Sequence, residues 1–255
     1  MTIRDHVPTG APCWVDLMSS DLEKSKAFYG ELFGWTADEP NPDFGGYTSF
    51  RKDGDQVAGL MTAQEAGMPG VWSVYLATPD AEKTVEVAKA NGARVLVEAM
   101  AIDTLGTMAV LADPGGAAIG MWQPGEHRGG LVGTGGAPCH FELHTRDYDK
   151  TVAFYKDVFG WDPETASDTP EFRYARLPVA DGEGAGIMDA AGFLPEGVPA
   201  HWSVYFAVDD VDQALAKVGE LGGSTIMAGE STPYGVLATA GDSTGAIFKL
   251  RADNS

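Results

Sequence analysis

The chain has 255 residues, of which 44% are hydrophobic, and a formal net charge of −20 at pH 7. This composition supports hydrophobic cores and excludes global disorder. The negative charge excludes a nucleic-acid partner, because phosphate backbones are bound through Lys and Arg. The sequence has no run near the ~18 apolar residues of a membrane-spanning helix, and its start lacks the apolar region of a signal peptide. We therefore expect a cytoplasmic protein with no membrane partner.

The first half of the sequence predicts alternating strands and helices. A strand is expected at 12–19, and Asp21 is a suitable N-cap for a helix over 22–33 that ends at Gly34. A second helix is expected over 80–90. The other strands are expected at 47–50, 56–61, 72–78, 94–97, 107–111 and 117–122.

The second half repeats this order, because Gly136–Trp161 aligns without a gap with Gly10–Trp35 and about half of the residues are identical. The helices of this half are expected at 148–159 and 210–221. Its strands are expected at 138–145, 172–177, 184–188, 201–208, 224–228, 235–240 and 246–251. The duplication predicts two domains, residues 1–123 and 137–255, joined by a glycine-rich linker at 124–136.

The two halves share an Ala-Phe-Tyr helix motif followed by Phe-Gly-Trp, and the first half also has an Asp-Pro-Gly-Gly turn at 113–116. With these motifs the chain resembles the vicinal oxygen chelate superfamily of glyoxalase I, bleomycin-resistance proteins and extradiol dioxygenases. The resemblance implies an α+β fold of two tandem glyoxalase-like domains, each with two βαβββ modules that wrap around a cavity. It implies no single activity, because the fold carries isomerases, dioxygenases, thiol transferases and binding proteins.

Metal-dependent members of this superfamily place ligands at four strand positions. The resemblance assigns these positions to Trp14 and His140, to the segments 58–61 and 185–188, to Ser73 and Ser203, and to Gly120 and Lys249. Only His140 is of a usual ligand type, and a Lys repels a divalent cation. We therefore expect no cofactor. A divalent metal relocated to His140 and Glu142, with His144, is the minority alternative, because alternate residues of a strand project to the same side.

Strand alternation predicts which side chains face each cavity. In domain 1 the set is largely apolar and aromatic, which suits a flat ligand. It comprises Trp14, Asp16, Met18, Ser73, Tyr75 and Trp122. In domain 2 the set is polar, which suits a polar or anionic part of a substrate. It comprises His140, Glu142, His144, Ser203, Tyr205, Lys249 and Arg251, with His201 at the rim.

The leading hypothesis is a metal-independent protein that binds a small aromatic or hydrophobic metabolite or drug. The alternative is a lyase, isomerase or hydroxylase/oxygenase in which His140, Glu142 and Lys249 are catalytic and Glu142 orients His140 for acid–base chemistry. Polar residues that only bond one another inside the cavity are a third interpretation. A metal-dependent glyoxalase I ranks below these, and both a monomer and a homodimer are compatible with the sequence.

Overall fold

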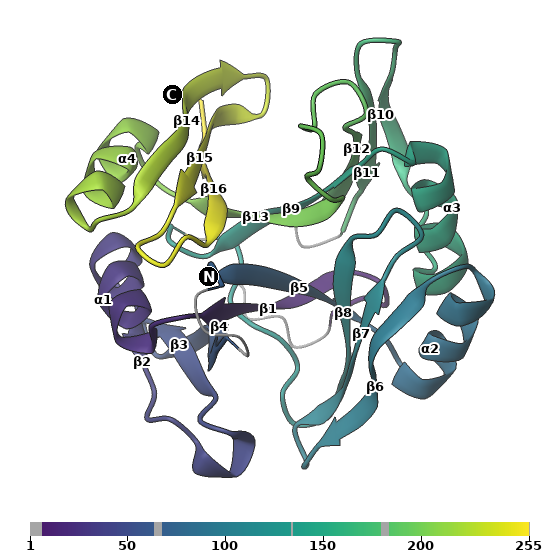
Figure 1. Cartoon of the computed structure of the whole chain (residues 1–255), viewed down its shortest axis with the longest axis horizontal. Helices are drawn as coiled ribbons and strands as arrows, with labels where there is room; N and C mark the ends of the chain where they lie inside the picture. Colours follow the sequence, from purple (N-terminus) through teal and green to yellow (C-terminus); the bar gives the residue numbers. More distant parts are fainter. Residues whose placement is uncertain (1–6, 64–67, 134, 180–183, 255) are drawn as a thin grey trace.

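A computed structural model describes residues 7–63, 68–133, 135–179 and 184–254, and these form two eight-stranded mixed sheets and four α-helices (Figure 1). The elements of the first half are β1 (Pro12–Ser19), α1 (Leu22–Phe33), β2 (Thr36–Ala37), η1 (Pro42–Phe44), β3 (Thr48–Lys52), β4 (Asp55–Thr62), β5 (Val71–Ala77), α2 (Ala81–Ala90), β6 (Arg94–Ile102), β7 (Gly106–Ala112) and β8 (Ala118–Pro124). Those of the second half are β9 (Pro138–Thr145), α3 (Tyr148–Phe159), β10 (Glu164–Asp168), β11 (Arg173–Leu177), β12 (Ala185–Asp189), β13 (His201–Ala207), α4 (Val211–Glu220), β14 (Ser224–Thr232), β15 (Gly235–Gly241) and β16 (Ile247–Ala252).

Each sheet takes all its strands from one half of the chain. The strand orders are β2-β3-β4-β1-β5-β8-β7-β6 and β10-β11-β12-β9-β13-β16-β15-β14. Two βαβββ modules meet at an antiparallel pair of central strands, β1 with β5 and β9 with β13. The predicted tandem fold is therefore confirmed, and the structure adds the strands β2 and β10, which the sequence pattern did not indicate.

The first helix begins and ends as its sequence predicts. The Asp21 side chain accepts a hydrogen bond from the Lys24 amide at 3.1 Å, and Gly34 closes the helix with a left-handed φ of 72°. In domain 2 the equivalent glycine, Gly160, has a φ of 68°. Glycine carries no steric penalty in this conformation, so both helices stop at the same point of the repeat. Among the described residues, no helix is long and apolar enough to cross a membrane.

The two sheets pack with their convex sides toward each other, with α1 beside α4 and α2 beside α3 (Figure 1). Aromatic rings from both halves form one core between the sheets. The rings of Phe33 and Phe206 lie 5.1 Å apart, and those of Trp35 and Phe206 lie 5.7 Å apart. Because residues such as Leu143 and Trp202 enter this core, their strand neighbours must point to the concave side of the sheet.

The Phe-Gly-Trp motifs join the two halves by a reciprocal pair of hydrogen bonds. Trp35 donates its indole N–H to the Gly136 carbonyl at 2.7 Å, and Trp161 donates to the Gly10 carbonyl at 2.8 Å. Gly10 has a φ of 79°, and a Cβ there would collide with the backbone of Phe159. The repeated sequence is therefore partly an interface between domains.

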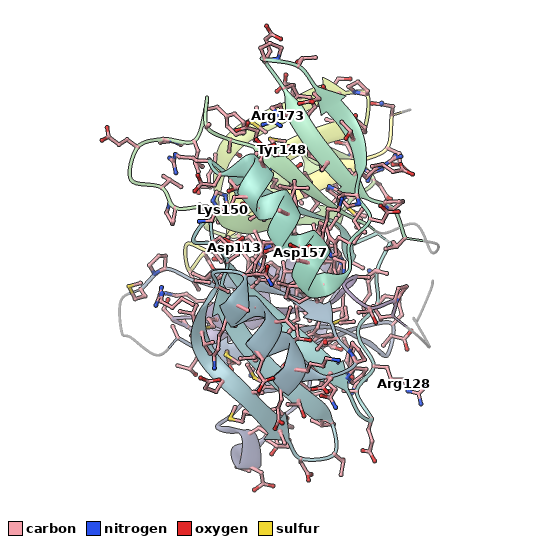
Figure 2. All side chains as sticks on the ribbon, turned by 90° about the vertical axis from the view of Figure 1, so that its right-hand side faces the viewer. Asp113, Arg128, Tyr148, Lys150, Asp157 and Arg173 are labelled. Carbon is pink, nitrogen blue, oxygen red and sulfur yellow. The ribbon has the colours of Figure 1, made fainter. Side chains whose placement is uncertain are left out.

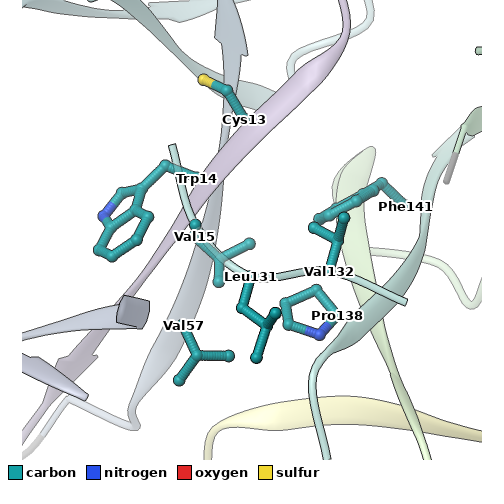
Figure 3. Close-up of a pocket in the computed structure, with 9 residues that line it drawn as sticks. Cys13, Trp14, Val15, Val57, Leu131, Val132, Pro138 and Phe141 are labelled. Carbon is teal, nitrogen blue, oxygen red and sulfur yellow. The ribbon is translucent and has the colours of Figure 1, made fainter. Parts of the chain in front are cut away.

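The glycine-rich segment between the sheets packs against domain 1. The Gly130 amide donates to the Cys13 carbonyl at 3.1 Å and the Leu131 amide to the Gln56 carbonyl at 2.8 Å. Leu131 and Val132 are buried and line a small apolar pocket with Val57 and Phe141 (Figure 3). This segment thus contributes to the core as well as connecting the domains.

Candidate functional site

The concave face of domain 2 gathers the polar side chains that strand alternation predicted. β9 supplies His140, Glu142 and His144, which alternate with core residues of the same strand. The backbone of Tyr205 in β13 pairs with His140 on one side and with Lys249 of β16 on the other. The prediction that these residues share one face is confirmed by this register.

Glu142 is the centre of this group. Its Oε1 atom lies 2.6 Å from His144 Nε2, 2.7 Å from the Tyr205 hydroxyl and 2.8 Å from Lys249 Nζ. Lys249 Nζ also lies 2.8 Å from the Tyr205 hydroxyl and 2.9 Å from His144 Nε2. The side chains of Glu142 and Lys249 are 5% and 13% exposed, so this is a buried ion pair. We call Glu142, His144, Tyr205 and Lys249 the domain 2 cluster.

Electrostatics define the protonation of the cluster. Burial would raise the pKa of Glu142, but Lys249 and His144 outweigh it and hold the pKa well below its usual range. Burial and the neighbouring Glu142 charge raise the pKa of Tyr205, which stays a neutral donor. Burial lowers the pKa of His140. The charges of Arg251 and Lys249 lower it further, and the charge of Glu142 opposes this shift. At neutral pH the Glu142 carboxylate is therefore ionised, the Tyr205 phenol is neutral and the His140 imidazole is neutral.

The hypothesis that Glu142 orients His140 is wrong in the structure, because Glu142 contacts His144 instead. His140 Nε2 lies 2.9 Å from the hydroxyl of Tyr174, a β11 residue that the sequence analysis missed. Tyr174 reaches this position across Gly186, where a Cβ would overlap its hydroxyl. A phenol from the neighbouring strand thus occupies the space over the segment 185–188, at the expected second ligand position.

The remaining predicted residues of domain 2 lie at the margin of the cluster. The backbone of the half-buried Ser203 pairs with that of Glu142. The ring of His201 lies 5.1 Å from that of His144. Arg251 is half-buried, lies two residues beyond Lys249 on the same face, and pairs with Asp253 at 3.5 Å.

Exposed aromatic rings stand next to this polar group. Phe193 is 55% exposed, and its ring lies 6.0 Å from that of His144. Phe172 is 37% exposed and stacks on Tyr174 at 5.7 Å. Exposed aromatic side chains gathered around buried polar groups are typical of a binding site for a small ring compound.

Domain 1 has a matching group, and its polar atoms also bond one another. Asp16 Oδ1 accepts hydrogen bonds from the Trp14 indole and from the Tyr47 hydroxyl, both at 2.8 Å. Burial raises the pKa of Asp16, while the bonds from Tyr47, Trp14 and Tyr75 lower it. Trp14, Asp16 and Tyr75 are each less than 10% exposed. Their role in binding a ligand stays a prediction.

Two further elements close this face of domain 1. The ring of His127, from the connecting segment, lies 4.4 Å from that of Trp14. The backbone carbonyl of His127 accepts the Trp122 indole N–H at 2.8 Å. The Tyr75 ring lies over Gly120, where a Cβ would overlap it. The remaining predicted residues, Met18 and Ser73, are half-buried. The two domains therefore offer unequal sites, because the exposed rings of Phe172 and Phe193 border only the buried polar group of domain 2.

The chemistry of the donors in domain 2 does not fit a divalent cation. The atoms of Glu142, His144 and Tyr205 converge on the ammonium of Lys249, and a second cation there would be repelled by it. Within the described residues, no three His, Cys, Asp or Glu side chains are arranged to hold a metal ion. The minority alternative of a metal on His140, Glu142 and His144 therefore gains no support from their arrangement.

The fold and the paired sheets define a class of tandem glyoxalase- and dioxygenase-like proteins. One similar solved structure is a Mn(II)-bound glyoxalase from Novosphingobium aromaticivorans, with 16% identity, a TM-score of 0.66, and coverage of 96% of this chain and 84% of that chain. Another is the 2,3-dioxygenase LapB from Pseudomonas sp. KL28, with 14% identity, a TM-score of 0.66, and coverage of 98% and 94%. At these identities the similarity shows the fold alone.

Sequence similarity gives the family. The model of the Glyoxalase/Bleomycin resistance protein/Dioxygenase superfamily matches residues 12–121 and 138–250, and the chain belongs to this superfamily. The chain is 37% identical to "Putative glyoxylase CFP32" of Mycobacterium tuberculosis, over 98% of this chain and 97% of that protein. It is 36% identical to the anthracycline biosynthesis protein DnrV of Streptomyces peucetius, over 94% of this chain and 92% of that protein.

Proposed function

We propose that the protein binds a small aromatic metabolite or drug on the concave face of domain 2, without a metal ion. The observation that carries this proposal is the combination of a buried Lys249–Glu142 pair with the exposed rings of Phe172 and Phe193 beside it. Flat ligands bind by stacking on such rings, while a few buried polar groups fix their orientation. The relative named for anthracycline biosynthesis supports an aromatic ligand, because the anthracycline ring system is flat.

Metal independence is proposed on the chemistry of the same site. The Lys249 ammonium lies within 2.9 Å of three donor atoms of the kinds that bind metals, a carboxylate, an imidazole and a phenol. Burying two charges is costly unless they are paired with good geometry, and this pair meets that condition. A metal ion bound to these atoms would displace the Lys249 ammonium, which would then be a buried charge without its counter-charge.

A second candidate function is an enzyme of the lyase, isomerase or hydroxylase/oxygenase type acting at the same site. His140 and Glu142 would move protons, and Lys249 would stabilise a developing negative charge. The observation that favours it is the contact of an ionised carboxylate with an imidazole and an ammonium. A metal-dependent glyoxalase I ranks below both, because that chemistry uses a metal to stabilise an enediolate.

The proposal needs no second copy of the chain, because all eight strands around the domain 2 site come from one half of the sequence. A monomer and a homodimer are both compatible with it. In either state, we expect one ligand per chain.

The test measures metal content and ligand binding separately. Metal analysis of untagged protein should find no stoichiometric metal, and one tightly held Zn, Ni, Mn or Fe per chain would overturn metal independence. Calorimetry with anthraquinone-2-carboxylate, a flat aromatic acid, should show one site per chain. The double variant Phe172→Ala, Phe193→Ala should bind this ligand more weakly. Leu96→Ala, at an exposed site of domain 1, should bind it as the wild type does. Absence of binding to the wild type would overturn the ligand class.

The second candidate needs its own assay. We expect no methylglyoxal turnover with glutathione, and metal-stimulated turnover would revive the glyoxalase I alternative. For any substrate found, His140→Ala and Glu142→Ala separate the two functions. Turnover that persists while binding weakens would exclude catalysis by these residues.

A further inference from the structure

The protons of the domain 2 cluster can be counted from its contacts. Glu142 Oε1 accepts the Tyr205 hydroxyl proton at 2.7 Å and one Lys249 N–H at 2.8 Å. The Tyr205 oxygen, with its own proton used, accepts a second Lys249 N–H at 2.8 Å. Two of the three ammonium protons are thereby directed at the protein.

The third Lys249 proton depends on His144. His144 Nε2 lies 2.6 Å from Glu142 Oε1 and 2.9 Å from Lys249 Nζ. It can donate a proton to Glu142 or accept one from Lys249, but it cannot do both. A bare Nε2 would face the carboxylate oxygen as acceptor against acceptor. The shorter contact, to the negative atom, is satisfied when Nε2 carries a proton and donates it to Glu142. His144 then cannot accept from Lys249, and among the described residues one ammonium N–H is left without an acceptor.

Lys249 is less completely buried than its partner in the ion pair. The Lys249 side chain keeps 13% of its surface exposed, in contrast to the 5% of Glu142. Arg251 stands two residues further along the same face with 35% of its side chain exposed. The Lys249 and Glu142 charges balance inside the site, and the carboxylate that pairs with Arg251, Asp253, is 92% exposed to solvent, which leaves Arg251 as the further cation on this face. The site is therefore suited to an anion.

We propose that Lys249 is the resident cation of the site and that its third N–H binds a single oxyanion, a carboxylate, phenolate or enolate, carried on the aromatic ligand. This inference rests on the proposed function and adds the charged group of the ligand. The oxyanion completes the hydrogen bonding of the ammonium, and the rings of Phe172 and Phe193 contact the aromatic part. Lys249 takes the place that the charge of a metal ion would have.

The test compares two ligands of one shape, anthraquinone-2-carboxylate and the neutral anthraquinone-2-carboxamide. The wild type should bind the carboxylate at least about tenfold more tightly, the ratio expected of a hydrogen bond to a charged group. Lys249→Met should abolish this preference. Lys89→Met removes a lysine charge from an exposed site in domain 1, and this variant should retain the preference for the carboxylate.

Lys249→Met leaves the Glu142 charge buried and unpaired, so the variant can fail to fold. The double variant Glu142→Gln with Lys249→Met removes both charges, and it should fold and bind both probes equally. A preference for the carboxylate that survives in either variant overturns the inference. Equal binding of both probes by the wild type overturns it while leaving the proposed function standing, whereas binding of neither probe overturns both.

Discussion

The hydroxyl of Tyr29 in α1 donates a hydrogen bond to Asp242 Oδ2, in the turn before β16 of the other domain, at 3.0 Å. Tyr155 in α3 makes the equivalent bond to Asp113 Oδ2 at 3.2 Å. Figure 2 shows Asp113 at the junction of the two halves, beside α3. The other oxygen of Asp113 accepts the Gly115 and Ala117 amides at 2.8 and 2.9 Å. The tyrosine of the Ala-Phe-Tyr motif thus connects each of these helices to a turn in the other domain. An aspartate within that turn accepts the tyrosine hydroxyl and also stabilises the turn.

Removing this hydroxyl should destabilise the folded protein. Tyr29→Phe removes the donor to Asp242 Oδ2, while Oδ1 keeps its bonds from Thr244 and Ala246, and this loss should lower the free energy of unfolding by about 1–3 kcal/mol. Tyr155→Phe should behave alike. Urea unfolding measures both, with Tyr234→Phe, at an exposed site, as the control. Unchanged stability in both core variants would show that the interdomain bonds contribute nothing.

A single methyl group at Gly186 should disturb the domain 2 site. Its Cβ would overlap the Tyr174 hydroxyl, so Gly186→Ala should displace that phenol from His140 and cost about 1–3 kcal/mol of stability. Gly219→Ala is the control, because nothing lies within 4 Å of a Cβ there and the residue is helical. It should be neutral or stabilise by up to about 1 kcal/mol. Thermal unfolding measures both, and equal Tm changes for the two variants would contradict this account.

The sequence predicted the fold through its periodicity and duplication. Capping residues such as Asp21, Gly34 and Gly160 act locally, so both limits of α1 and the end of α3 follow from the chain itself. The exposed two-residue strand β2 and the strand β10, with its exposed and polar residues, were missed because neither shows an apolar period. Such strands form when a neighbour offers hydrogen bonds, which is a tertiary effect.

Strand alternation also predicted which residues share the concave face, but it could not pair them. Glu142 has an imidazole two residues away on each side, and only the position of Lys249 and Tyr174 decides that it contacts His144. Tyr174 was missed because it reaches the site from another strand. The sequence did carry a signal for Tyr174. Each half has a tyrosine in or directly before the strand that pairs with Ala-Gly-Leu/Ile-Met, Tyr174 in β11 and Tyr47 before β3, and the glycine of that motif leaves room for the hydroxyl.

Acidification should destabilise the protein through His127. Burial lowers the pKa of His127 to about 4, from an ordinary value of 6.5. Between these values the unfolded chain binds a proton that the folded chain does not, so stability falls as pH decreases from about 6.5 to about 4. The full loss is at most roughly 3.5 kcal/mol, at about 1.4 kcal/mol for each pKa unit. His127→Phe should lose less stability between pH 7 and pH 5 than the wild type in urea unfolding. Parallel curves would show that His127 titrates normally in the folded state.

The Lys249–Glu142 pair should show strong coupling in stability. Glu142→Gln leaves the ammonium without its counter-charge and Lys249→Met leaves the carboxylate without its own, and each change should cost about 3–5 kcal/mol. The double variant carries neither charge, so it should be much more stable than the sum of the single effects predicts. Urea unfolding of the four proteins gives the coupling energy, and additive effects would contradict a direct ion pair. The pH dependence gives a second readout, because the pKa of Glu142 lies well below its ordinary value of 4.5. Its contribution is present above pH 4.5 and is lost as pH falls through the folded-state pKa, so the double variant should lack this acid-induced loss.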